Sequence, residues 1–232
     1  MAHWNLVNKV IFESDILIMV LDARHPELSR NHEIEKKILK QNKKIIYVLN
    51  KSDLAKHIFF DKKLSINVSA KHHKGTMKLL RILSRISKGE KVVVGVLGYP
   101  NTGKSSVINA LKGKSSAGVS SISGYTKAIQ AVRVTKNIKL LDTPGVFPKK
   151  KHDEIVHALI GAKDVQKMKD PELVALELID LLPEIKEKYS VEGDDCEEVL
   201  EKISEKLNFL GKGGKPDTIR AAKKIIFDIQ NN

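Results

Sequence analysis

Hydrophobic and polar positions follow different patterns in the two parts of this chain. Before residue 143, short and almost continuous apolar runs alternate with longer segments in which apolar residues recur every three or four positions. Such runs are typical of strands buried on both faces of a sheet, and the longer recurrence is typical of amphipathic helices. The alternation predicts a mostly parallel sheet with helices on both faces. The predicted strands lie at 16–21, 45–49, 64–68 and 91–97, and the predicted helices at 5–14, 29–41 and 75–87.

The stretch after the fourth strand completes the sheet. A helix follows that strand and ends near Gly113, and residues 115–126 are small, polar and glycine-containing, which is typical of a loop. Residues 128–135 and 138–141 are typical of a hairpin with its turn at 136–137. The hairpin adds an antiparallel edge, so we expect six strands in all.

From residue 153 the pattern is only helical. Asp170 followed by Pro171 is typical of a helix cap and a first helical position. We therefore expect an α/β domain at 1–150 and a small all-α domain at 151–232. The apolar faces expected to be buried are Ile34, Ile38 and Leu39 in the second helix, Val199, Ile203 and Leu207 in a later one, and Ile219, Ala222, Ile226 and Ile229 in the last.

The composition of the chain indicates the type of cellular compartment that it suits. The chain has 232 residues and a single cysteine, Cys196, so it has no internal disulfide and suits a reducing compartment. It has neither an apolar run near the roughly 20 residues that span a bilayer nor a signal-peptide pattern at its N-terminus. We expect a cytoplasmic monomer without membrane contact, although the sequence does not itself exclude an organelle.

The net charge of +13 is unevenly distributed. Residues 1–150 have 28 Lys and Arg against 10 Asp and Glu, whereas residues 151–232 have 13 against 18. A strongly positive domain favours a polyanionic partner such as RNA, because each neutralised phosphate releases counterions. The alternative is that the charge serves solubility alone.

Residues 98–105 read G-Y-P-N-T-G-K-S, the pattern G-x-x-x-x-G-K-S of a phosphate-binding loop. The pattern has the context it needs, since a predicted strand precedes it and a predicted helix follows, which directs backbone N–H groups and the helix dipole at phosphate oxygens. Lys104 would add a charge at the β- and γ-phosphates, and the Ser105 hydroxyl would hold Mg²⁺. The candidate nucleotide-binding residues here are Asn101, Thr102, Gly103, Lys104, Ser105 and Ser106.

Two further segments are typical of guanine recognition. Residues 50–53 read N-K-S-D directly after a predicted strand. The Asp53 carboxylate would accept from the ring N–H and the exocyclic amine of guanine, a donor pair that adenine lacks; Asn50 would contact the base edge and the Lys51 stem would lie along the ring. Residues 69–71, Ser69, Ala70 and Lys71, follow the next strand, and the Ala70 N–H would meet the guanine O6. The alternative for the first segment is an ordinary polar turn.

A last segment completes a nucleotide site. Residues 142–145 read D-T-P-G at the end of the second hairpin strand. We expect Asp142 to order the Mg²⁺ shell, the Gly145 N–H to meet the γ-phosphate, and Thr126 to add a hydroxyl to Mg²⁺. The next residue, Val146, cannot orient an attacking water as a glutamine does in many GTPases, so the catalytic residue is unknown and slow intrinsic hydrolysis is expected.

The order of these segments resembles a Ras-like G domain that has been cut and rejoined. N-K-S-D, S-A-K, the phosphate loop, Thr126 and D-T-P-G give the order G4-G5-G1-G2-G3, which is similar to the circularly permuted GTPases of the YlqF/YawG type. D-A-R-H-P at 22–26 and F-L-G-K-G-G-K-P-D at 209–217 resemble segments of that family too. The resemblance implies a permuted G domain at 1–150 and a helical RNA or ribosome contact at 151–232.

The same resemblance suggests a function and leaves alternatives. It implies a GTP-hydrolysing switch in ribosome assembly, on ribosomal RNA or the large subunit. Bacterial members of that family have a W-F-P-G-H-M segment whose His is implicated in hydrolysis, whereas here Trp4 is followed by N-L-V, so the resemblance does not supply the catalytic group. Asn101 matches the asparagine of GTPases that place K⁺ near the phosphates, although it could simply hold the loop's turn. The alternatives are a regulatory GTPase with a protein partner and a non-enzymatic RNA-binding module that only holds GTP.

Overall fold

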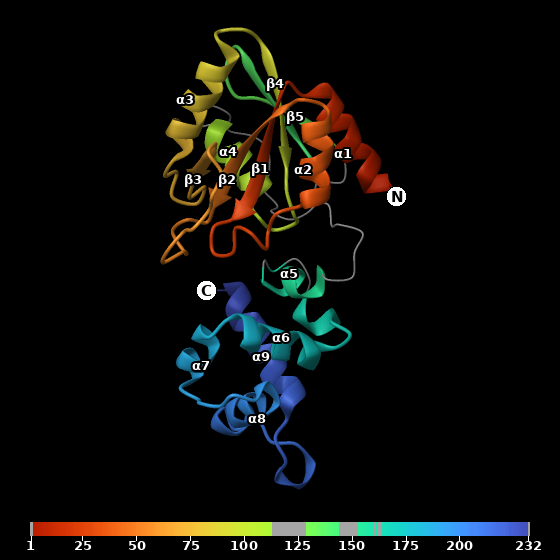
Figure 1. The fold of residues 1–232 in the computed structure, drawn as a ribbon, viewed down its shortest axis with the longest axis vertical. Coiled ribbons are helices and arrows are strands. Elements are labelled where there is room, and N and C mark those ends of the chain that lie inside the picture. The colour runs from red at the N-terminus through yellow and green to blue at the C-terminus, as the bar shows by residue number, and fades with distance from the viewer. Residues whose placement is uncertain (1, 113–128, 144–152, 160, 162–163, 232) are drawn as a thin grey trace. The chain divides into compact units, whose positions relative to one another are not determined.

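The chain forms two compact units, Met1–Lys149 and Lys150–Asn232. The structure is a computed structural model, and it describes residues 2–112, 129–143, 153–159, 161 and 164–231. Figure 1 follows the chain from the N-terminal α/β unit into the helical unit.

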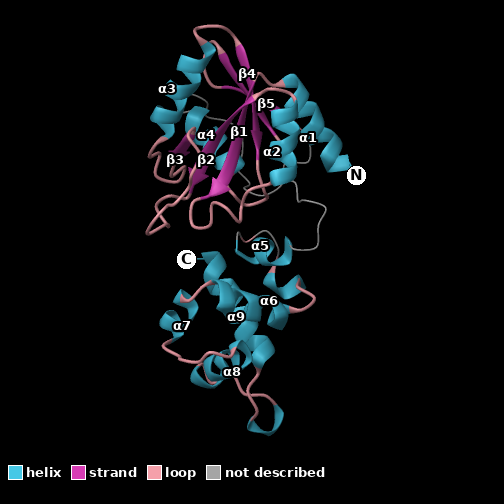
Figure 2. Cartoon of the chain, viewed as in Figure 1, coloured by secondary structure: helices cyan, strands magenta, loops and turns pink. Residues whose placement is uncertain are grey.

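The first unit is built on a six-stranded sheet with the order β3-β2-β1-β4-β6-β5. All neighbouring strands are parallel except β5 and β6, which form the antiparallel hairpin at one edge (Figure 2). The predicted fold class is therefore confirmed. The strands are β1 (Ile16–Asp22), β2 (Lys44–Asn50), β3 (Ser65–Asn67), β4 (Val92–Leu97), β5 (Gln130–Arg133) and β6 (Ile138–Asp142).

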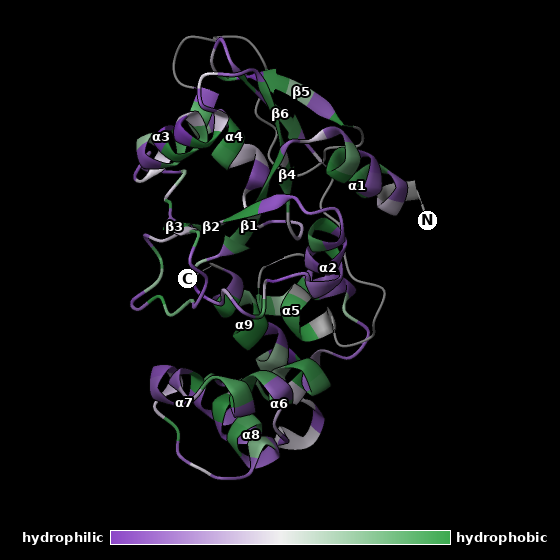
Figure 3. Ribbon diagram, turned by 45° about the horizontal axis from the view of Figure 1, so that its top comes forward, coloured by the Kyte–Doolittle hydropathy of each residue, from purple (hydrophilic) through white to green (hydrophobic). Residues whose placement is uncertain are grey.

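Among the described residues of this unit, four helices cover the two faces of the sheet (Figure 1). Leu79 of α3 and Val107 of α4 pack into a core on one face, and Val10 of α1 and Ile38 of α2 pack into a core on the other. Figure 3 shows both hydrophobic and hydrophilic residues on each of these helices, as the apolar recurrence predicts. The helices are α1 (Ala2–Glu13), α2 (His32–Lys40), α3 (Thr76–Ser87) and α4 (Lys104–Lys112).

Helix α2 differs from its predicted face at one residue. Ile34 and Ile38 are buried, but Leu39 is 61% exposed, so its assignment to the core was wrong. The helix begins at an Asn31 cap, whose side chain accepts from the Ile34 N–H. At about 100° per residue Leu39 lies roughly 140° around the helix from Ile34, beyond the buried stripe.

The sheet places the predicted motifs at one edge. The chain moves from β1 to β2 and β3 on one side, and from β4 to β6 and β5 on the other, so the order reverses between β1 and β4. Ligands of open α/β sheets bind outside the carboxyl ends of the strands at such a reversal. Asp22 is in register with Asn50, and Val96 with Asp142, so these strand ends lie close together.

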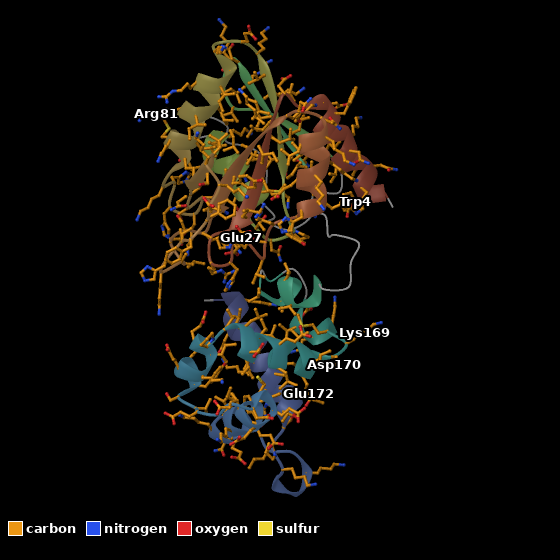
Figure 4. The ribbon with its side chains drawn as sticks, in the orientation of Figure 1. Trp4, Glu27, Arg81, Lys169, Asp170 and Glu172 are labelled. Atoms are coloured by element: carbon orange, nitrogen blue, oxygen red, sulfur yellow. The ribbon has the colours of Figure 1, made fainter. Side chains whose placement is uncertain are left out.

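The second unit is helical, as the pattern after residue 153 predicts. Asp170 accepts from the Leu173 N–H and caps α6 with Pro171 at its first position; Figure 4 labels Asp170 and Glu172 there. Helix α9 packs against α5, α6 and α8. The elements are α5 (Asp153–Leu159), η1 (Val165–Lys167), α6 (Pro171–Leu181), α7 (Glu184–Tyr189), α8 (Cys196–Lys206), η2 (Lys212–Gly214) and α9 (Thr218–Asn231).

The buried face of α9 is shifted from the predicted one. Ala222 and Ile226 are fully buried as expected, and their neighbours Ala221 and Ile225 are fully buried too, whereas Ile219 is 49% exposed. The prediction that Ile219 faces the core was wrong, because the buried arc is centred about a quarter turn away from it. Within the part of the chain that the structure describes, no helix is long and apolar enough to cross a membrane.

Candidate functional site

Three segments that lie far apart in the sequence line one cavity of about 510 Å³ in the first unit. They are the turn after β2, the turn after β3 and the loop after β4. The structure thus brings most of the sequence-predicted nucleotide residues together. The lining residues are Asn50, Lys51, Asp53, Leu54, Ala70, Lys71, Asn101, Gly103 and Ser106.

The Asn50 side chain joins all three segments. Its Nδ2 donates to the Thr102 carbonyl at 2.9 Å, and its Oδ1 accepts from the Ala70 N–H at 3.1 Å. The residue is buried, so each of these bonds is protected from water. Both Asn50 and the Ala70 N–H were expected to meet the base, whereas here they bond to each other. An amide has two N–H donors, so a base contact would use the second one.

The glycine before Lys104 is required by that asparagine. Gly103 has φ +89°, and a Cβ there would lie 2.2 Å from Asn50 Nδ2. Gly98, at the start of the loop, has φ +147°, and a Cβ there would lie 2.4 Å from the Val20 carbonyl oxygen on β1. Both glycines of the motif therefore allow backbone to approach a neighbouring strand end.

Lys51 is held by a carboxylate that the sequence analysis did not include in the site. Lys51 has a left-handed backbone with φ +62°, and its Nζ lies 2.8 Å from Asp22 Oδ2. Asp22 is fully buried and also accepts from Arg24, through Nε at 3.0 Å and a terminal nitrogen at 2.8 Å. Burial alone would raise the pKa of Asp22, but Arg24 and Lys51 outweigh it and bring the pKa to about 2.

The carboxylate expected to read guanine lines the cavity in its ionised form. Hydrogen bonding from Ser69 lowers the pKa of Asp53, against the opposing effect of burial, and the charge of Lys71 lowers it further. His72 Nε2 also lies 3.5 Å from Asp53 Oδ2. A charged carboxylate accepts hydrogen bonds only, which suits a ligand edge with two donors.

The phosphate loop holds a buried ammonium group. Lys104 is 7% exposed, and its Nζ donates to the Tyr99 carbonyl at 2.7 Å. Burial lowers the pKa of Lys104 to about 8, against the opposing effect of the Asp142 carboxylate. The Thr102 hydroxyl donates to the same Tyr99 oxygen at 2.9 Å, which closes the loop around the lysine. A cation in this environment is suited to an anionic ligand.

The two predicted Mg²⁺ ligands that the structure describes lie in contact. The Ser105 hydroxyl donates to Asp142 Oδ2 at 2.9 Å, joining the start of α4 to the end of β6. A hydroxyl and a carboxylate are oxygen donors of the kind that Mg²⁺ takes beside phosphate oxygens, so the donor set fits this ion. The predicted residues Thr126, Gly145 and Val146 lie outside the described residues.

A family described as "50S ribosome-binding GTPase" matches residues 93–211, just over half of the chain. The match begins in β4, so the segments at 50–53 and 69–71 lie ahead of it.

Two relatives match almost the whole chain. An uncharacterized GTP-binding protein of Methanocaldococcus jannaschii is 44% identical over 241 residues, covering 97% of this chain and 64% of that protein. Nucleolar GTP-binding protein 2 of Saccharomyces cerevisiae is 34% identical over 245 residues, covering 97% of this chain and 50% of that protein. The chain thus spans about half to two thirds of the length of these relatives.

The solved structures that match are of the predicted fold. The crystal structure of GNP-bound YlqF from T. maritima gives a TM-score of 0.67 at 24% identity, covering 100% of this chain and 94% of that one. GDP-bound YlqF gives 0.68 at 24% identity, covering 97% and 93%. YlqF is a circularly permuted GTPase. The chain therefore belongs to the 50S ribosome-binding GTPase family and has the circularly permuted GTPase fold that its motif order predicted.

Proposed function

We propose that this chain binds GTP, hydrolyses it to GDP and phosphate, and acts as a switch in ribosome assembly at the large subunit. The observation that carries the proposal is the cavity of about 510 Å³ in which Asp53, Ala70 and Gly103 meet from three distant segments. A carboxylate acceptor and a phosphate loop around one cavity suit a guanine nucleotide.

The guanine base would be read by Asp53. Its ionised carboxylate accepts from the ring N–H and the exocyclic amine, and a site built on such bonds rejects a base without those donors by roughly 10⁴–10⁵. Lys51, held by Asp22 at 2.8 Å, would lie along the ring. Ala70 and Lys71, which line the cavity, would close it at the base, and Ser69 would hold the Asp53 carboxylate.

The phosphates would be held by the loop at 101–106 and by Lys104. Mg²⁺ would be held by Ser105 and Asp142, with Thr126 as a further ligand, and when bound it neutralises charge on the phosphate oxygens. Gly145 would bind the γ-phosphate. Because the side chain of Val146 has no hydrogen-bonding group, we propose that intrinsic hydrolysis is slow and that the ribosome stimulates it.

Exchange of one side chain tests the base assignment. Asp53→Asn replaces the acceptor by an amide that can donate, so GTP affinity should fall by roughly 10²- to 10⁴-fold, the worth of two hydrogen bonds to a charged group. Affinity for xanthosine triphosphate, which carries an oxygen in place of the exocyclic amine, should rise. Asp61→Asn, an exposed carboxylate of the same unit, is the matched control. Unchanged GTP affinity in Asp53→Asn would contradict the assignment.

A potassium ion near the phosphates is the proposed aid to hydrolysis. Asn101 belongs to the phosphate loop, has a left-handed backbone with φ +60°, and lines the cavity. Hydrolysis should be faster in KCl than in NaCl. Asn101→Gly tolerates the positive φ and removes the side-chain oxygen, so it should remove the difference between the two salts. Equal wild-type rates in both salts would refute a potassium site.

The proposed partner is ribosomal RNA or the large ribosomal subunit, bound by a monomer in the cytoplasm. Support comes from the family, from the nucleolar relative and from the excess of Lys and Arg in residues 1–150. We further propose that residues 151–232 contribute to this contact. Co-sedimentation with ribosomal subunits should be strong with a non-hydrolysable GTP analogue, weak with GDP, and salt-dependent. Salt-independent sedimentation, or the same amount with both nucleotides, would favour a regulatory GTPase with a protein partner.

A further inference from the structure

A groove of about 500 Å³ lies on the exposed face of α9 in the helical unit. Residues 219, 220, 223, 224 and 227 fall on one side of this helix at about 100° per residue, opposite the buried alanines and isoleucines. Phe209, from the segment before η2, borders the same groove. The groove is lined by, among others, Phe209, Ile219, Arg220, Lys223, Lys224 and Phe227.

The groove combines flat apolar surfaces with cations. Phe227 is 54% exposed and Ile219 49%, and because both border the groove they give it an apolar lining that is open to solvent. The Arg220 guanidinium stands over the Phe209 ring at 4.2 Å, and the Lys224 ammonium lies 6.0 Å from the centre of the Phe227 ring. Each ring is therefore paired with a positive charge.

Charge in the helical unit is segregated toward this groove. Residues 170–205 carry thirteen Asp and Glu against three Lys, whereas residues 206–231 carry six Lys and Arg against two Asp. Of these two, Asp217 accepts from the Arg220 N–H at 3.0 Å and so caps α9, and Asp228 forms an ion pair with the Lys224 ammonium at 2.5 Å. A basic groove on an otherwise acidic unit selects a polyanion by charge complementarity.

We propose that this groove binds an unpaired stretch of RNA, with a base stacked on the exposed ring of Phe227 and a phosphate on Lys223. The proposal rests on the RNA partner proposed above and names the surface and the form of RNA. Exposed aromatic rings beside a row of cations are the means by which proteins bind splayed bases of single strands, whereas the bases of a duplex are stacked on each other and inaccessible to such rings.

Fluorescence anisotropy of the full chain with a labelled 12-nucleotide single strand tests the groove. Phe227→Leu keeps an apolar side chain but loses the ring, so affinity should fall about tenfold, the effect of losing one stacked base. Phe227→Tyr keeps the ring and should bind like the wild type. A duplex of the same length should bind less tightly and should not distinguish these variants.

Salt dependence separates phosphate contacts from structural effects. Lys223→Gln should reduce the slope of log affinity against log salt by about 0.7, the value for one phosphate of a single strand. Lys202→Gln on α8 removes the same charge outside the groove and should leave the slope unchanged.

Binding to ribosomal subunits separates failure of the groove from failure of the function. If the wild type sediments with subunits in a GTP-dependent way while Phe227→Leu and Lys223→Gln bind the single strand like the wild type, the groove proposal is wrong and the proposed function stands. The groove proposal would also be wrong if Phe227→Leu and Phe227→Tyr changed the affinity for the single strand equally. If the wild type binds neither subunits nor RNA, the function itself is wrong.

Discussion

The buried charge of Lys104, in the phosphate loop, should destabilise the nucleotide-free protein. A variant with an uncharged side chain at this position should therefore be more stable than the wild type when no nucleotide is bound. Lys104 has its pKa lowered on folding from 10.5 to about 8. At pH 7 the lysine is charged in both states, so the lowered pKa opposes folding by about 3 kcal/mol, at 1.36 kcal/mol for each pKa unit. The bond to the Tyr99 carbonyl offsets about 1 kcal/mol of this.

We therefore expect Lys104→Met to raise the unfolding free energy at pH 7 by about 2 kcal/mol in nucleotide-free protein. Trp4 is the only tryptophan of the chain and packs against one core of the α/β unit, so its fluorescence follows unfolding of that unit in urea. With about 2 kcal/mol per M for the urea dependence, the midpoint should rise by about 1 M. Lys91→Met, which alters an exposed lysine of the same unit, should change little.

The stability of the wild type should depend on pH through Lys104. Between pH 8 and 10.5 the unfolded chain binds a proton at this lysine that the folded chain has lost, so wild-type stability rises with pH in that window. The advantage of Lys104→Met over wild type should shrink by about 3 kcal/mol across that window. Above pH 10.5 the wild type should therefore be the more stable by about 1 kcal/mol, the worth of the Lys104 bond to the Tyr99 carbonyl.

Nucleotide should reverse the order of the two proteins. GDP at a hundred times its Kd should stabilise the wild type by about 2.7 kcal/mol, and it should leave Lys104→Met unchanged. If nucleotide-free Lys104→Met is less stable than wild type at pH 7, and by the same amount at pH 10, the buried-charge reasoning is refuted.

Three other substitutions follow from the same contacts. Asp22→Asn should cost about 2 kcal/mol at neutral pH, and in urea titrations this cost should persist down to about pH 4 and disappear toward pH 2, because the lowered pKa of Asp22 stabilises only while the carboxylate is ionised. Gly103→Ala should displace the Asn50 amide and weaken GTP binding at least tenfold in equilibrium titration, whereas Gly89→Ala, at a similar φ but in open space, should leave binding unchanged. Tyr189→Phe removes a 2.8 Å bond to α9 and should cost about 1 kcal/mol, visible as faster amide exchange in α9 with nucleotide binding intact.

Local chemistry made much of this protein predictable. Continuous apolar runs mark β1 and β2 because both faces of a parallel strand are buried. Asp170 with Pro171 marks a helix start because the Asp170 side chain accepts from a free backbone N–H and Pro171 has no N–H that needs a partner. The phosphate loop and N-K-S-D at 50–53 were recognisable for the same reason, since each motif is contiguous.

Helix faces were less predictable than helices. Leu39 and Ile219 were expected inside and lie exposed, since the arc of a helix that is buried depends on the angle at which it meets its neighbours. The exposed face of α9, with Phe227 and its cations, was therefore not apparent from the spacing of apolar residues alone.

The sequence by itself determined the strands, the order of the motifs and the chemical types that surround the cavity. Only the tertiary structure decided that Asn50 links Thr102 to Ala70, that Asp22 holds Lys51, and that Gly103 leaves room for an amide. These contacts join residues up to 52 positions apart, and they exist because parallel strands bring their carboxyl ends to one edge in a register set by packing. No local sequence pattern contains that register. The contacts by which Asn50 and Asp22 position other site residues could therefore be found only from the tertiary structure.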